Sequence, residues 1–240
     1  AYAVHYTSRR EQEEAGMLGF GERGVVIPIG LDVGDLRVRT DGEGGAGIFP
    51  GLEGCRVVLF LSRLDRKKGL EILLESFAHL SAGASDLRLL IGGDGEAGYL
   101  EVLKRRAADL GLEGKVIWAG FLEGETKRAA LRCAAVYCLP SYSENFGIAA
   151  VEAMAAGIPC VFTEGVGIAA EAESAGAAVV VPPESPRLSA AIGALLEDGA
   201  RGEEMGKRGR AWAERAYSLA GMGVALKALY RGEWEVLGKL

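Results

Sequence analysis

The stretch RVVLFLSRLDRKKGLEILLESFAHL, residues 56–80, decides the fold. Its apolar run Val57–Leu61 has the length and composition of a buried strand, and Leu70–Leu80 carries apolar residues at helical spacing. Between them lies a polar loop that ends at Gly69. A buried strand, a turn and an amphipathic helix begin a crossover between parallel strands, because the helix must pack back on the sheet.

The same pattern recurs along the rest of the chain. Further strands are predicted at Leu87–Ile91, Lys115–Gly120, Val136–Leu139, Cys160–Thr163 and Ala178–Val181. Helices are predicted at about Glu96–Leu110, Lys127–Ala134, Gly147–Ala156, Ile168–Ser174, Pro186–Glu197, Gly202–Ala216 and Leu219–Leu237. Strands that alternate with helices in this way indicate an α/β protein with a parallel six-stranded sheet, covered on both faces.

The first 33 residues follow a different pattern. A strand at Ala1–Thr7, a helix at Arg9–Leu18 and a strand at Val25–Ile29 are predicted, which is too little for a domain of its own. Residues 34–54, with the glycine-rich run 41–47, have too few apolar side chains for a core. We therefore expect a remnant of a preceding domain (1–27), a crossover and glycine-rich linker (28–54), an α/β domain (55–218) and a C-terminal helix (219–240).

Composition narrows the classes of function. The 240 residues are 49% hydrophobic and 25% charged, with a formal net charge of −6, which does not favour broad binding to nucleic acid. The sequence contains no apolar run of the roughly 18 residues that span a bilayer and no signal-peptide pattern, so we expect a cytoplasmic protein. Four cysteines without CxxC spacing and two unpaired histidines predict free thiols and no metal site.

A basic loop follows the first long strand. Arg63, Arg66, Lys67 and Lys68 stand between that strand and the start of its helix. Because ligands of open α/β sheets bind outside the carboxyl ends of the strands, this loop is a candidate anion site. The alternative is a solvated, charged loop with no ligand.

A glycine motif follows the next strand. Residues 93–98 have the spacing GxGxxG, and Glu113 lies 20 residues beyond Gly93, where an acid that binds ribose would stand in a dinucleotide-binding fold. The motif alone suggests NAD. However, a complete strand, loop and helix precede it, and glycine is frequent in this chain, with 36 of the 240 residues.

The most specific motif runs from Pro140 to Gly147 and into the following helix. Glu144 precedes the helix and Glu152 lies in its second turn, about 12 Å away if the segment is mostly helical. The backbone amides of residues 146–148 would face an anion at the helix start. The alternative is that Glu144 caps the helix and Glu152 is a surface acid, although the apolar neighbours of Glu152 make an idle carboxylate costly.

Together these segments resemble the C-terminal donor-binding domain of GT-B glycosyltransferases, group 1 (family 4), over about residues 25–235. The residues that carry the resemblance are Arg63, Lys68-Gly69, Gly92–Gly95, Trp118–Phe121, Pro140-Ser141, Glu144–Gly147 and Glu152–Pro159. The resemblance implies a Rossmann-like, doubly wound sheet that forms the C-terminal half of a GT-B fold, with residues 55–218 as the domain that binds a nucleotide-diphosphate sugar.

The resemblance also implies roles for individual residues. Catalytic contacts to the diphosphate and the sugar fall on Arg63, Lys68 and Glu144. The donor-binding residues would be Gly93 and three further groups. Phe121 and Leu122 would contact the base, and Glu152 would bind the ribose. The sugar and the phosphate would be contacted by Asn145, Phe146, Gly147 and Ile148. The sequence departs from the family pattern at Ile29, where Asn is common, and at Asn145, where Gly is frequent.

By resemblance, the activity is transfer of a hexose-type sugar with retention, without a metal and without a cofactor, to a sugar or lipid-linked acceptor. The resemblance further implies a missing N-terminal acceptor domain, through which the protein would be peripheral at a membrane. The fragment alone would then be inactive, and its exposed interdomain surface would favour self-association. Two alternatives stay open: an NAD-binding domain of an oxidoreductase, and a GT-B relative such as a nucleotide-sugar epimerase or a sugar phosphorylase.

Overall fold

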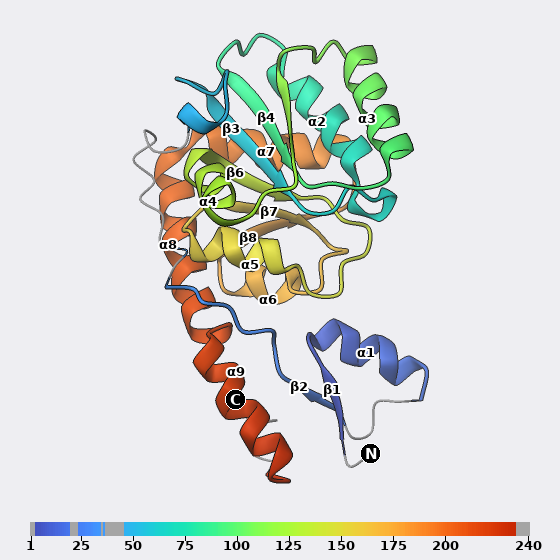
Figure 1. Ribbon diagram of the computed structural model, residues 1–240, viewed down its shortest axis with the longest axis vertical. Helices are drawn as coiled ribbons and strands as arrows, with labels where there is room; N and C mark the ends of the chain where they lie inside the picture. The colour runs from blue at the N-terminus through green and yellow to red at the C-terminus, as the bar shows by residue number, and fades with distance from the viewer. Residues whose placement is uncertain (1–2, 20–23, 35, 37–45, 234–240) are drawn as a thin grey trace.

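The computed structural model describes residues 3–19, 24–34, 36 and 46–233 (Figure 1). One parallel sheet has the strand order β5-β4-β3-β6-β7-β8. Its strands are β3 (Arg56–Leu61), β4 (Leu87–Gly92), β5 (Val116–Gly120), β6 (Ala134–Leu139), β7 (Cys160–Thr163) and β8 (Ala178–Val181). The predicted α/β fold with six parallel strands is confirmed. The chain runs from β3 out to β5 and then returns to β6, so the strand order reverses between β3 and β6.

Helices cover both faces of this sheet (Figure 1). On one face α2 (Leu70–Ser81) packs between α3 (Ala97–Asp109) and α7 (Ser185–Glu197). The crossovers on the other face are α4 (Gly124–Cys133), α5 (Ile148–Ala155) and α6 (Ala169–Ser174), and α8 (Gly199–Ala216) packs against α5. Short 3₁₀ turns, η1 (Ala46–Ile48) and η2 (Arg66–Lys68), complete the element order.

Two helices begin three residues earlier than predicted, in each case because of a cap. Glu123 and Thr126 form a capping box, which starts α4 three residues before the predicted Lys127. The side chain of Asp198 accepts a hydrogen bond from the amide of Arg201 and starts α8 at Gly199.

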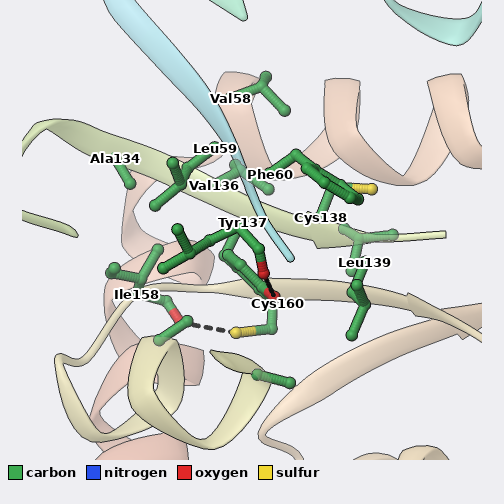
Figure 2. Close-up of a cluster of buried hydrophobic side chains, with 14 of the residues drawn as sticks. Val58, Leu59, Phe60, Ala134, Val136, Tyr137, Cys138, Leu139, Ile158 and Cys160 are labelled. Atoms are coloured by element: carbon green, nitrogen blue, oxygen red, sulfur yellow. Dashed lines mark hydrogen bonds between the residues drawn. The ribbon is translucent and has the colours of Figure 1, made fainter. Parts of the chain in front are cut away.

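The core is centred on the neighbouring strands β3 and β6, where the side chains of Val58, Leu59, Phe60, Val136 and Tyr137 are completely buried (Figure 2). Each such side chain contributes about 1.5–3 kcal/mol relative to an exposed position. All four cysteines are free thiols, as predicted; the expectation that they are buried holds for Cys138 and Cys160, whereas Cys55 and Cys133 are partly exposed. The thiol of Cys160 is buried and donates a hydrogen bond to the carbonyl oxygen of Ile158, with 3.2 Å between sulfur and oxygen. Figure 2 shows this contact.

The N-terminal segment forms a second, two-stranded parallel sheet. Its elements are β1 (Val4–Tyr6), α1 (Arg9–Met17) and β2 (Gly24–Val26). The strand predicted at Val25–Ile29 ends earlier, because Pro28 has no N–H to donate to a ladder. Parts of the strand predicted at Ala1–Thr7 and of the glycine-rich run 41–47 lie outside the described residues.

The chain crosses from this segment to the large sheet beside the start of α9 (Leu219–Tyr230). The amide of Leu31 donates to the carbonyl of Tyr217 at 2.8 Å, and the amide of Leu219 donates back to Leu31 at 3.1 Å. Only glycine fits at position 30, since a Cβ there would lie 2.8 Å from the Cα of Leu219. The helix predicted at Leu219–Leu237 ends at Tyr230, followed by Gly232 with a φ of 77°; residues 234–237 lie outside the described residues.

Candidate functional site

Two loops meet where the strand order reverses. After β3, the side chain of Asp65 accepts a hydrogen bond from the amide of Lys67 and starts η2, which ends at Gly69 with a φ of 67°. A Cβ at Gly69 would lie 2.1 Å from the carbonyl oxygen of Pro140, so glycine lets the two loops touch. The amide of Tyr142 then donates to the carbonyl of Lys67 at 2.8 Å.

The loop after β6 is held from its other side by the loop after β7. The hydroxyl of Thr163 donates to the carbonyl of Ser141 at 2.5 Å, and the amide and carbonyl of Glu144 bond to Gly165 and Gly167. This network therefore holds the backbone of Glu144 between the loops after β3 and β7.

Lys68 and Glu144 form an ion pair between the two loops. The side chain of Lys68 is 4% exposed and that of Glu144 is 19% exposed. One predicted site residue from each loop therefore comes together with the other: Lys68, a predicted phosphate-binding cation, and Glu144, the predicted sugar-binding acid. A buried pair of this kind needs both partners, because either charge alone would be costly.

A buried phenol joins the two strands beneath this pair. The Tyr137 hydroxyl, from β6, donates to the carbonyl of Leu61, the last residue of β3, at 3.1 Å. Burial raises the pKa of Tyr137 well above its ordinary value, with smaller contributions from its neighbours, including the carboxylates of Glu152 and Glu144. The phenol is therefore a neutral hydrogen-bond donor that links β6 to the last residue of β3.

The other basic side chains of the first loop lie apart from the pair. Arg63 is exposed, and it forms no hydrogen bond or ion pair among the described residues. The Arg66 guanidinium lies over the ring of Tyr99, 5.0 Å from its centroid, and Lys67 is exposed. Arg63 and Lys67 are thus cations of this loop that are exposed to an incoming anion.

Glu152 has a partner that the sequence analysis missed. Lys127, on α4, places its Nζ 2.6 Å from Oε1 of Glu152 on α5. The Glu152 side chain is 12% exposed, while its neighbours Val151 and Ala153 are completely buried. The apolar neighbours of Glu152 indicated that its carboxylate would have a partner, but the spacing did not point to Lys127, because the contact joins two different helices.

The start of α5 presents backbone donors beside Glu144. Gly147 has a φ of 94° and precedes Ile148, the first residue of the helix, whose first amides have no acceptor within the helix. The ring of Phe146 is buried and packs edge-to-face on Tyr217, with centroids 5.4 Å apart. Asn145 is exposed, and its carbonyl accepts a hydrogen bond from the Ser8 hydroxyl at 2.8 Å. The predicted amides therefore lie at the expected end of the helix.

The glycine motif has a structural explanation. A Cβ at Gly93, where φ is 138°, would lie 1.8 Å from the carbonyl of Ser62, and one at Gly95 would lie 2.1 Å from the carbonyl of Leu64. These glycines let the loop after β4 approach the loop after β3. Glu113 precedes β5, so it lies at the amino edge of the sheet, opposite the glycines. The pattern that suggested NAD thus separates into two unrelated features.

The predicted base contacts follow β5. Leu122 is buried, and its Cδ1 approaches Gly92 so closely that a Cβ there would lie 2.6 Å away. Phe121 is 66% exposed. This places an exposed aromatic ring at the carboxyl edge of the sheet, the edge that also carries the two charged loops.

A cavity of 1160 Å³ lies beside this site and not in it. It is bounded by the N-terminal segment, the end of α8 and the start of α9. Phe146 lines it, whereas Arg63, Lys68 and Glu152 do not. We place the candidate site at the open carboxyl edge, because the charged groups gather there.

Comparison with known proteins identifies the family. The family model described as glycosyl transferases group 1 matches residues 50–212, more than half of the chain. The chain belongs to the group 1 glycosyltransferases. Among the described residues of this group 1 chain, no helix is both long enough and apolar enough to cross a membrane.

Curated relatives of this group 1 chain include two bacterial transferases. Identity to the phosphatidyl-myo-inositol mannosyltransferase of Mycolicibacterium smegmatis is 36%, over 82% of the chain and 48% of that protein. Identity to the alpha-D-kanosaminyltransferase of Streptomyces kanamyceticus is 30%, over 75% of the chain and 47% of that protein. The chain therefore spans about half the length of these relatives.

Solved structures agree on the fold. HepE of Anabaena, in complex with UDP and glucose, matches with a TM-score of 0.86 at 24% identity, over 96% of the chain and 63% of HepE. The C-terminal domain of a glycosyl transferase group 1 family protein from Francisella tularensis matches with a TM-score of 0.71 at 17% identity, over 79% of the chain and 100% of that domain. The six-stranded sheet with its helices is that of GT-B glycosyltransferases.

Proposed function

We propose that this chain is the nucleotide-sugar donor-binding part of a retaining glycosyltransferase. The observation that carries the proposal is the Lys68–Glu144 pair, held between the loops after β3 and β6 and beside the first amides of α5. A cation, an acid and free amides at the point where the strand order reverses suit a ligand with a diphosphate and a hydroxylated sugar.

The chemistry follows from where charge develops. As the bond from sugar to diphosphate breaks, negative charge grows on the bridging oxygen, and fixed cations and amides stabilise it most effectively at that moment. Arg63 and Lys68 would supply the cations, and Glu144 would orient the hydroxyls of the sugar. We further propose that the whole protein has a second domain that holds a sugar or lipid-linked acceptor. Through that domain the protein would lie at the periphery of a membrane.

The names of the relatives suggest ligands for a first binding test. HepE binds UDP and glucose, and two curated relatives transfer mannosyl and kanosaminyl groups according to their names. A thermal-shift panel should therefore contain UDP, GDP, ADP, their sugars and NAD. Stabilisation by NAD alone would favour the oxidoreductase alternative. Product analysis with the nucleotide sugar would separate a transferase from an epimerase or a phosphorylase.

Calorimetry on two variants tests the diphosphate contacts. Arg63→Ala and Lys68→Ala should each weaken the best nucleoside diphosphate at least tenfold, because a charge-assisted hydrogen bond contributes about 1.5–3 kcal/mol. The nucleoside without phosphates should lose far less. Lys207→Ala, which removes an exposed lysine paired with Glu203 on α8, is the control and should change neither affinity. Equal losses for both ligands would contradict the assignment.

A further inference from the structure

Lys127 pairs with Glu152 through tertiary packing. Its Nζ lies 2.6 Å from Oε1 of Glu152, and the two residues come from different helices, 25 positions apart in sequence. Exposed pairs one turn apart on a single helix contribute little to stability, and Lys104 with Glu101 on α3 is a pair of this kind. The Lys127–Glu152 pair differs because Glu152 is mostly buried and α5 is packed against α8.

The pair leaves Glu152 able to bind something else. A carboxylate can accept about four hydrogen bonds, and Lys127 uses one oxygen, Oε1. The ammonium of Lys127 also fixes the Glu152 side chain before a ligand binds. Binding then costs less conformational entropy, because this side chain is already ordered.

We propose that Lys127 is a positioning residue that holds Glu152 ready to accept the hydroxyl groups of a ribose. The inference rests on the proposed function, since it assumes that Glu152 faces the ribose of a donor nucleotide. The same arrangement repeats at Lys68 and Glu144, so each acid of the site has its own lysine, while Arg63 has no partner among the described residues. Lys127 then contributes to affinity through Glu152 and not through a contact of its own.

The test compares a nucleoside diphosphate with its 2′,3′-dideoxy counterpart by calorimetry on the 240-residue chain. The ligand is whichever of UDP, GDP and ADP the wild type binds. We expect Lys127→Met to weaken the ribose ligand about tenfold and the dideoxy ligand less than twofold. Lys127→Arg should restore most of the affinity, because it keeps the positive charge beside Glu152. Lys104→Met is the matched control and should change nothing.

A second background separates this role from a direct contact. In a Glu152→Gln protein, which we expect to have lost its preference for the ribose ligand, Lys127→Met should have little further effect. If Lys127→Met weakens both ligands equally, and does so again beside Glu152→Gln, then Lys127 contacts the ligand itself and the inference is wrong. An effect of Glu152→Gln without any effect of Lys127→Met would overturn the inference and leave the proposed function intact. If the wild type binds none of the three diphosphates, both the inference about Lys127 and the proposed donor-binding function are wrong.

Discussion

At the scale of single residues, the Lys68–Glu144 pair has a stability role besides its proposed role in binding. Glu144→Gln leaves the ammonium of Lys68 almost completely buried without a counter-charge, and we expect a loss of about 3 kcal/mol in the free energy of unfolding. This is the low end for such pairs, because Glu144 keeps some contact with water. The measurement is urea unfolding of the variant beside the wild type.

The double variant Lys68→Met with Glu144→Gln is the control for this prediction. It removes the buried charge altogether, so it should recover a large part of the lost stability. If the losses of the two single variants simply add, the ion pair is not coupled in solution. The affinity experiments on Lys68 and Glu144 should therefore be read beside their unfolding curves.

The residues of the site show what sequence can predict. Arg63, Lys68 and Glu144 could be singled out because each stands in a loop between a predicted strand and a predicted helix, and Glu152 could be singled out because it is an acid among apolar neighbours within a helix. Lys127 could not, because its contact depends on the distance between α4 and α5 in the folded chain. The proposed binding roles of all these residues remain predictions.

At the scale of elements, α5 carries Glu152 and is held at its far end by Arg210 of α8. The guanidinium donates to the carbonyls of Ala155 and Ala156 at 3.2 and 2.7 Å. A cation there also interacts favourably with the dipole of the helix. Arg210→Met should therefore cost about 2 kcal/mol of unfolding free energy, and the amides of residues 156–158 should exchange with solvent faster.

A neighbouring residue on the same helix provides the control for Arg210. Arg208 is more than half exposed and pairs with Glu204 one turn away, so Arg208→Met should cost no more than about 0.5 kcal/mol. Both variants remove a guanidinium from α8 with the same substitution. Equal losses in urea unfolding would show that Arg210 has no special role at the end of α5.

Elements of the large sheet were predictable because their strands are continuous apolar runs, and the bounds of β7 and β8 agree with the prediction to the residue. Errors lie where a local feature competes with the pattern. Pro28 shortens β2, and α9 stops at Tyr230 although the apolar periodicity continues beyond it. Caps such as Asp198 lengthen α8, since a side chain outside the apolar pattern supplies the first hydrogen bond.

At the scale of the whole molecule, apolar side chains gather on the helix that leaves the large sheet. Leu219, Val224 and Tyr230 of α9 are 55%, 67% and 86% exposed, and none of the described residues of this helix is buried. An exposed apolar surface of this kind favours association in water. We therefore expect the 240-residue chain to associate with itself as its concentration rises.

Val224→Lys should reduce that association, because it places a charge at an exposed apolar position near the middle of α9. Sedimentation velocity over a wide concentration range gives the measurement. The control is Val102→Lys on α3, where a valine that is 48% exposed lies on a different part of the molecule. Both substitutions add one positive charge, so a general effect of net charge would act on them equally. A weaker association for Val224→Lys alone assigns the contact to α9, whereas equal behaviour of the two variants, or a wild type that stays monomeric throughout, would contradict the prediction.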